Sequence, residues 1–242
     1  LFGTLIVGIY LILRSRKVYF PKGQIGQIFF LGLLNTLLAL LAFYAFANTS
    51  IAISEVLLYV YPIYIVILAP LILKEKTNNT IIINLLAAFL GIILIAFSAN
   101  YSYKSDTFWG IIASFFAGII FALYVVYGKL IGKNISAIEL SLYQLIVSVI
   151  LLFPFALYYG AQITVFQMKL LILMGLFHSA IAVSLYFYGL KSIKAQHVGA
   201  LSYIEPLSAV VYALFIFGEI PNIFTVIGGL LIIIGGYRVT KK

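Results

Sequence analysis

The sequence predicts an all-α, polytopic membrane protein, a bundle of membrane-spanning helices. Of its 242 residues, 64% are hydrophobic and only 9% are charged, and the mean hydropathy is +1.20. A soluble domain is roughly half apolar and about a quarter charged. A soluble fold could not cover this much apolar surface, because its exterior must face water, so the bilayer is the solvent that fits.

Charged and turn residues divide the chain into nine apolar segments. Backbone groups in lipid must be paired internally, so each segment is predicted to be a transmembrane helix. The alternating strands of about ten residues that form a membrane barrel are not found. The first segment is shorter than the roughly 20 residues of a full span, and we interpret it as part of a longer helix. The segments are 1–13, 27–47, 51–73, 80–98, 107–128, 138–158, 170–190, 198–217 and 222–237.

The basic residues predict the orientation in the membrane. If all nine segments span, every Lys and Arg among the 15 except Lys104 and Lys169 falls on one side. The positive-inside rule makes that side cytoplasmic, which places the C-terminus inside. We therefore expect a multi-pass protein of the cytoplasmic membrane.

An internal repeat runs through the chain. Residues 43–91 align with residues 187–235 without a gap, at an offset of 144 residues. The informative signal is a Tyr-x-x-Pro followed thirteen residues after the proline by Glu, because Pro and Glu are rare in this chain. It pairs Tyr59 with Tyr203, Pro62 with Pro206, and Glu75 with Glu219.

The repeat predicts two domains, residues 1–98 and residues 107–239. Shifting the second back by 144 residues matches its last four helices to the first four of the chain. The repeat unit therefore has five helices, and the first helix of repeat one is absent, which predicts ten helices for the intact protein. Because five is odd, the two repeats enter the membrane from opposite sides, the inverted arrangement of many secondary transporters.

Three stretches of the repeat are informative: SEVLLYVYPIYIVILAPLILKEK (54–76), GALSYIEPLSAVVYALFIFGEI (199–220) and the glycine-rich GGLLIIIGG (228–236). They resemble the EamA domain of the drug/metabolite transporter superfamily. The resemblance covers almost the whole chain and implies a ten-helix carrier of small metabolites. By match, Pro62, Glu75, Pro206 and Glu219 fill the family's positions, whereas Lys74 stands where the second copy has Gly218.

Glu205 is the strongest candidate for substrate binding or ion coupling. It lies in the middle of an apolar segment, where a charge costs on the order of 3 kcal/mol on insertion scales. Pro206 follows it and cannot donate to the carbonyl of Ser202. A carboxylate beside a free carbonyl could bind a cationic or amino-bearing substrate or carry a proton. The alternative is a protonated Glu that bonds a neighbouring helix.

Three further candidates lie on the repeated helices. Glu55 shares a helix face with Tyr59, although it could also be an interfacial Glu at a helix N-terminus. Tyr59 and Tyr203 are matched in the repeat, and each phenol could bond either the substrate or the opposing helix.

His178, Ser179 and Asn35 are polar residues at the centre of their segments, at similar depth in the two repeats. They could line a cavity, although a lone His is more often a packing residue. Glu75 and Glu219 end their helices, and their repeated position favours a structural role, as do the mid-helix prolines.

The remaining features favour a transporter over an enzyme. We find no nucleotide-binding Gly-rich motif, no hydrolase motif and no cysteine, so neither catalysis, a cofactor nor a metal is expected. The net charge of +9 comes from Lys and Arg that lie between the apolar segments. We therefore interpret these residues as determinants of membrane topology and not as a nucleic-acid-binding surface. The expected function is secondary transport of a small metabolite, such as an amino acid or amphipathic solute, by alternating access, with protons as a candidate coupling ion. The alternative is a non-transporting membrane interaction protein or an inactive fragment.

Overall fold

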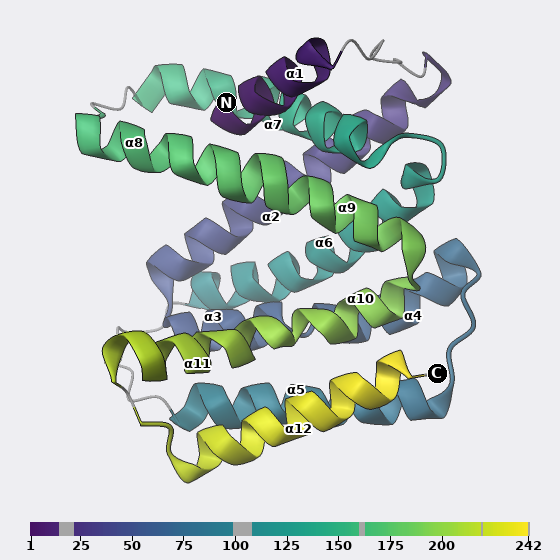
Figure 1. Cartoon of the computed structure of the whole chain (residues 1–242), viewed down its shortest axis with the longest axis vertical. Helices are drawn as coiled ribbons and strands as arrows, with labels where there is room; N and C mark the ends of the chain where they lie inside the picture. The colour runs from purple at the N-terminus through teal and green to yellow at the C-terminus, as the bar shows by residue number, and fades with distance from the viewer. Residues whose placement is uncertain (15–21, 99–107, 160–162, 219, 242) are drawn as a thin grey trace. The chain divides into compact units, whose positions relative to one another are not determined.

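The computed structural model describes residues 1–14, 22–98, 108–159, 163–218 and 220–241, and every regular element in these ranges is helical (Figure 1). Seven helices in these ranges are long and apolar enough to span a bilayer, and two more are apolar but shorter. The all-α, polytopic prediction is thus confirmed, while nine spans remain a prediction.

The helices lie within a few residues of the predicted segments. The first half of the chain contains α1 (Phe2–Leu13), η1 (Lys22–Gln24), α2 (Ile25–Asn48), α3 (Ile51–Leu58), α4 (Tyr61–Leu73) and α5 (Asn79–Ser98). The second half contains α6 (Phe108–Gly132), α7 (Ala137–Tyr159), α8 (Val165–Met174), the π-helical η2 (Gly175–Ala182), α9 (Val183–Ser192), α10 (Ala195–Ser202), α11 (Ile204–Phe217) and α12 (Ile223–Thr240).

Two predicted helices are broken near their middle. Tyr59 and Val60 separate α3 from α4, and Tyr203 separates α10 from α11. Each break is followed by a proline, Pro62 or Pro206, which removes a backbone donor and disfavours a continuous helix. The breaks lie at the same repeat position, so the two copies of the sequence fold in the same way here.

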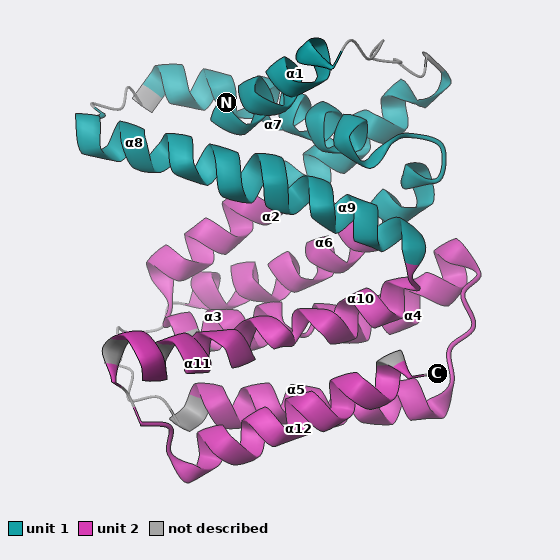
Figure 2. Ribbon diagram, in the orientation of Figure 1, with its two compact units in different colours: residues 1–37, 127–192 teal, residues 38–126, 193–242 magenta. Residues whose placement is uncertain are grey.

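The structure forms two compact units, each built from both predicted repeats (Figure 2). Unit 1 comprises residues 1–37 and 127–192, and unit 2 comprises residues 38–126 and 193–242. In unit 1, α1 packs on α7 and η2 through an apolar core of Val7, Leu11, Leu142 and Ala180.

In unit 2, α5 and α12 lie side by side in backbone contact (Figure 1). A Cβ placed on Gly91 would lie 2.4 Å from the carbonyl oxygen of Gly228, and one on Gly228 would lie 2.5 Å from that of Gly91. A Cβ on Gly235, the repeat equivalent of Gly91, would lie 2.5 Å from the carbonyl oxygen of Asn84, the equivalent of Gly228. Small residues that allow helices this close are typical of membrane bundles.

Candidate functional site

The helix breaks of unit 2 lie against each other. The Tyr203 hydroxyl donates a hydrogen bond to the Tyr59 carbonyl at 3.2 Å, and the two rings have centroids 6.5 Å apart. In an unbroken helix the Tyr59 carbonyl would accept from the Ile63 N–H. Here the Ile63 N–H donates to the Val60 carbonyl instead, so the Tyr59 carbonyl is available. The break therefore creates the acceptor that joins the two repeats.

Two carboxylates and two phenols gather beside this contact. The Tyr59 phenol faces the Glu205 carboxylate, and Glu55 lies close enough to Glu205 for their charges to interact. The Tyr61 phenol faces the Ser202 hydroxyl. Tyr59 and Tyr61 are buried, Glu55 is half-buried and Glu205 is exposed. Carboxylate oxygens beside buried phenols can accept from a cation, an amine or a proton.

The backbone around this cluster is held by close packing. A Cβ on Gly199 would lie 3.0 Å from the Cβ of Pro62, so α10 rests directly on α4. The Ser202 hydroxyl donates to the carbonyl of Gly199 at 2.6 Å. Pro62 and Pro206 are both buried. The structure therefore brings together Glu55, Tyr59, Ser202, Tyr203 and Glu205, which the sequence proposed separately, with both repeated prolines beside them.

Glu75 links the two repeats at a helix terminus. Its carboxylate accepts a hydrogen bond at 2.9 Å from the Ala195 N–H, at the first residue of α10. The amide of Gln196 donates to the Thr77 hydroxyl at 2.6 Å. An acidic group at this position satisfies a free N–H and complements the helix dipole. The matched Glu219 lies outside the described residues.

The other three candidates belong to unit 1. Asn35 donates to the Ser148 hydroxyl at 3.0 Å, so its amide ties α2 to α7. Ser179 packs against Gly3, where an added Cβ would lie 2.4 Å from the Ser179 Cβ. His178 is exposed, in the π-helical η2.

Sequence reasoning missed several polar residues. Tyr61 is fully buried beside the carboxylates, and its repeat equivalence with Glu205 was an available signal. Thr36 joins the contact between Asn35 and Ser148 by donating to Ser148 at 3.0 Å. Gln144 is buried on α7, and its side-chain amide has no hydrogen-bond partner among the described residues. Isolated polar residues of this kind show no periodic pattern in a sequence.

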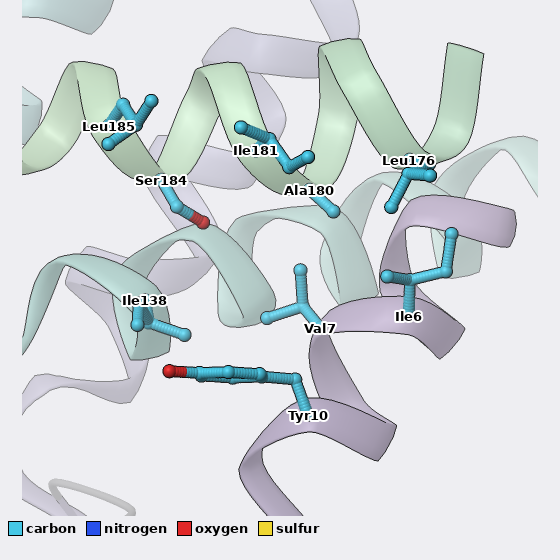
Figure 3. A pocket seen from close by; sticks show the side chains of 9 residues that line it. All are labelled: Ile6, Val7, Tyr10, Ile138, Leu176, Ala180, Ile181, Ser184 and Leu185. Carbon is cyan, nitrogen blue, oxygen red and sulfur yellow. The ribbon is translucent and has the colours of Figure 1, made fainter. Parts of the chain in front are cut away.

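Unit 1 also contains an apolar cavity of about 290 Å³ (Figure 3). It lies between α1, the start of α7 and the η2–α9 helix, and its polar groups come from Tyr10 and Ser184. None of the predicted site residues lines it. The cavity therefore has little to select a polar solute.

Comparison with known proteins agrees with this architecture. The model of the EamA-like transporter family matches residues 1–97 and 108–240. An uncharacterised transporter of Archaeoglobus fulgidus is 31% identical over 191 residues, which cover 79% of this chain and 67% of that protein. The pseudopaline exporter CntI of Pseudomonas aeruginosa is 22% identical over 237 residues, covering 96% of this chain and 80% of CntI.

A solved crystal structure shares the fold, with a TM-score of 0.84 over 99% of this chain and 85% of the other, at 16% identity. The family and the names of these relatives indicate a membrane transporter and not an enzyme. The resemblance noted in the sequence is confirmed, and this chain belongs to the EamA-like transporter family.

Proposed function

We propose that this chain is a secondary transporter that moves a small metabolite, such as an amino acid or another amphipathic solute, across the cytoplasmic membrane by alternating access. The observation that carries the proposal is the pair of helix breaks at Tyr59 and Tyr203, which gathers polar groups within apolar helices. Many secondary transporters bind their substrate beside discontinuous helices related by an internal repeat.

The glycine contacts support an inverted repeat. Gly91 meets the carbonyl of Gly228 and the side chain of Ile232, and Gly235 meets Asn84 and Ala88, the equivalents of those two residues. Exchanging the repeats thus reproduces the same contacts, as expected for two copies related by a two-fold axis. Two such copies can exchange conformations, which is the physical basis of alternating access.

Glu205 is the proposed substrate or proton group, with Glu55 and the Tyr59 phenol as its neighbours. A carboxylate within a membrane helix is costly unless it is paired, so Glu205 is suited to pair with an amine or to carry a proton. His178, Ser179 and Asn35 remain predicted cavity residues. The name of the relative CntI supports export as a direction to test.

The test is flux in proteoliposomes with a pH gradient and a mixed panel of amino acids and other metabolites. Glu205→Gln should abolish the pH dependence, whereas Glu139→Gln, which alters a carboxylate that caps α7 at Ser136, should retain it. Unchanged pH dependence in Glu205→Gln would rule out coupling through this residue.

The same assay is run on an extended chain in which residues 108–144 are repeated ahead of Leu1. This length continues the 144-residue register of the repeat, so it adds a copy of α6 ahead of α1. Flux in either form supports a carrier. Absence of flux from both forms, across the panel, favours the non-transporting membrane partner.

A further inference from the structure

The apolar cavity of unit 1 lies along two helices that run in the same direction. Ile6 and Leu176 are at one end of it, and Tyr10 and Ser184 are towards the other (Figure 3). The helices α1 and η2–α9 therefore form two long walls, and Ile138 of α7 adds to a third. Because both long walls belong to segments predicted to span the membrane, the cavity extends in the direction of the lipid chains.

The cavity has a buried side and an open side. Val7 and Ala180 are buried lining residues, where α1 packs on η2. Ile181 and Leu185 also line the cavity, but they are 43% and 63% exposed. An apolar molecule can therefore enter from the surface of the helix bundle without passing through the protein.

The chemistry of the lining favours a hydrocarbon chain. Most of the lining is aliphatic, and its polar groups come from Tyr10 and Ser184. Cavities lined by aliphatic side chains stay dry and bind apolar molecules. A volume of about 290 Å³ is close to the lower limit of ligand pockets, about 300 Å³, so it suits one part of a flexible chain. Within a bilayer, the acyl chains of phospholipids meet this description.

A positive charge lies at the Tyr10 end of the cavity. Arg14 follows Tyr10 by about one turn of α1, and its guanidinium carbon lies 5.7 Å from the centroid of the Tyr10 ring. Arg14 is exposed, and the planar fork of N–H donors in a guanidinium matches the oxygens of a phosphate. This end belongs to the side that is predicted to be cytoplasmic, where anionic lipids give the membrane surface a negative potential.

Two other charged residues near this end are engaged within unit 1. Lys191, in the last turn of α9, donates to the Ile135 carbonyl. Glu139 accepts from the Ser136 hydroxyl at the start of α7, and it also lies close enough to Lys191 for their charges to interact. Arg14 is therefore the cation that we assign to an anionic headgroup.

We propose that this cavity binds one acyl chain of an anionic phospholipid, whose phosphate pairs with Arg14. The acyl chain lies along Ile181 and Leu185, and the headgroup lies beside Tyr10, an amphipathic ring of the kind that is enriched at membrane interfaces. The bound chain contacts α1 and η2–α9 together, so the lipid joins these helices. The site shares no residue with the polar candidate site of unit 2.

Fluorescence quenching by brominated lipids tests the site. Trp109, the single tryptophan of the chain, is changed to Phe, and Leu185→Trp places a reporter on the open side of the cavity. The protein is reconstituted in phosphatidylcholine with a small fraction of phosphatidylglycerol, and one lipid at a time carries bromine on its acyl chains. We expect phosphatidylglycerol to quench the Leu185→Trp reporter by more than its share of the bilayer.

Matched variants separate the site from general contact with lipid. Ile150 is 62% exposed on α7 and does not line the cavity, so quenching of an Ile150→Trp reporter should follow the share of each lipid. Arg14→Gln should lower the preference of the Leu185→Trp reporter for phosphatidylglycerol about fivefold, which corresponds to about 1 kcal/mol for one basic residue. Lys169→Gln removes the same charge from α8, on the side predicted to be opposite, and should leave the preference unchanged.

Filling the cavity gives a second readout. Ala180→Leu enlarges a lining residue and should remove the excess quenching by phosphatidylglycerol. Ala182→Leu makes the same change at an exposed residue outside the lining and should not. Thermal unfolding in detergent shows whether both variants fold. The Arg14→Gln comparison, at an exposed helix end, decides the proposal even where Ala180→Leu does not fold.

Three results would overturn the proposal. The first is quenching that follows the bilayer composition at both reporters. The second is an equal effect of Arg14→Gln and Lys169→Gln, which would assign the preference to net charge instead of to Arg14. The third is displacement of the lipid by glycerol phosphate, because a headgroup anion without an acyl chain should not compete for a site that holds the chain.

Discussion

Tyr203 and Tyr59, residues 144 apart and equivalent in the repeat, are joined by a hydrogen bond from the Tyr203 hydroxyl to the Tyr59 carbonyl. The arrangement is asymmetric, because the Tyr203 phenol donates to the backbone whereas the Tyr59 phenol faces Glu205. The two equivalent tyrosines therefore have different roles. Tyr203 holds the two helix breaks together, and Tyr59 lines the candidate site.

This asymmetry gives the first prediction. Tyr203→Phe leaves a buried carbonyl without its donor, which should lower the free energy of unfolding by about 1–3 kcal/mol. Tyr59→Phe keeps that bond and should instead alter the pH dependence of flux. Thermal unfolding in detergent and proteoliposome flux, measured on both variants, separate the effects. Equal losses of stability in Tyr203→Phe and Tyr59→Phe would contradict these different roles.

The contact between α5 and α12 gives the second prediction. Gly91→Ala and Gly235→Ala each place a methyl group against a backbone carbonyl, at 2.4 and 2.5 Å. We expect each to cost about 1–3 kcal/mol through overpacking. Gly189→Ala, on α9, meets nothing within 4 Å and should be neutral or stabilising, because Ala favours a helix. Thermal unfolding of the three variants in detergent tests this expectation. An unchanged stability of Gly91→Ala would contradict the close approach of α5 and α12.

The sequence predicted the helices well, because they depend on local composition that can be read along the chain, whereas the inverted repeat and its two domains remain predictions. It did not predict that the segments 51–73 and 198–217 break at Tyr59 and Tyr203, although Pro62 and Pro206 signalled a disturbance. Nor did it predict which polar residues meet. The contacts of Asn35 with Ser148 and of Glu75 with Ala195 join residues more than 100 positions apart, and only the packing of the helices decides them.

Glu75 gives the third prediction. Glu75→Ala removes the acceptor of the Ala195 N–H and should destabilise the start of α10 by about 1 kcal/mol. Glu75→Gln retains an oxygen acceptor and should lose only the interaction with the helix dipole, about 0.3–1 kcal/mol. Hydrogen exchange of the Ala195 amide should therefore be fastest in the Ala variant. Unchanged exchange in both variants would show that the carboxylate does not cap this helix.

Lys74 gives the last prediction. It ends α4 with φ of +59°, and its repeat equivalent Gly218 has φ of +69°. A left-handed backbone costs roughly 1–2 kcal/mol for a residue with a Cβ, and glycine avoids that cost although it loses more entropy on folding. Lys74→Gly should therefore raise the free energy of unfolding by about 0.5–1 kcal/mol. Lys76→Gly removes the same charge nearby, where the backbone is not left-handed, and should not stabilise. Thermal unfolding of the two variants side by side tests the strain, and equal changes would assign the effect to charge instead of backbone conformation.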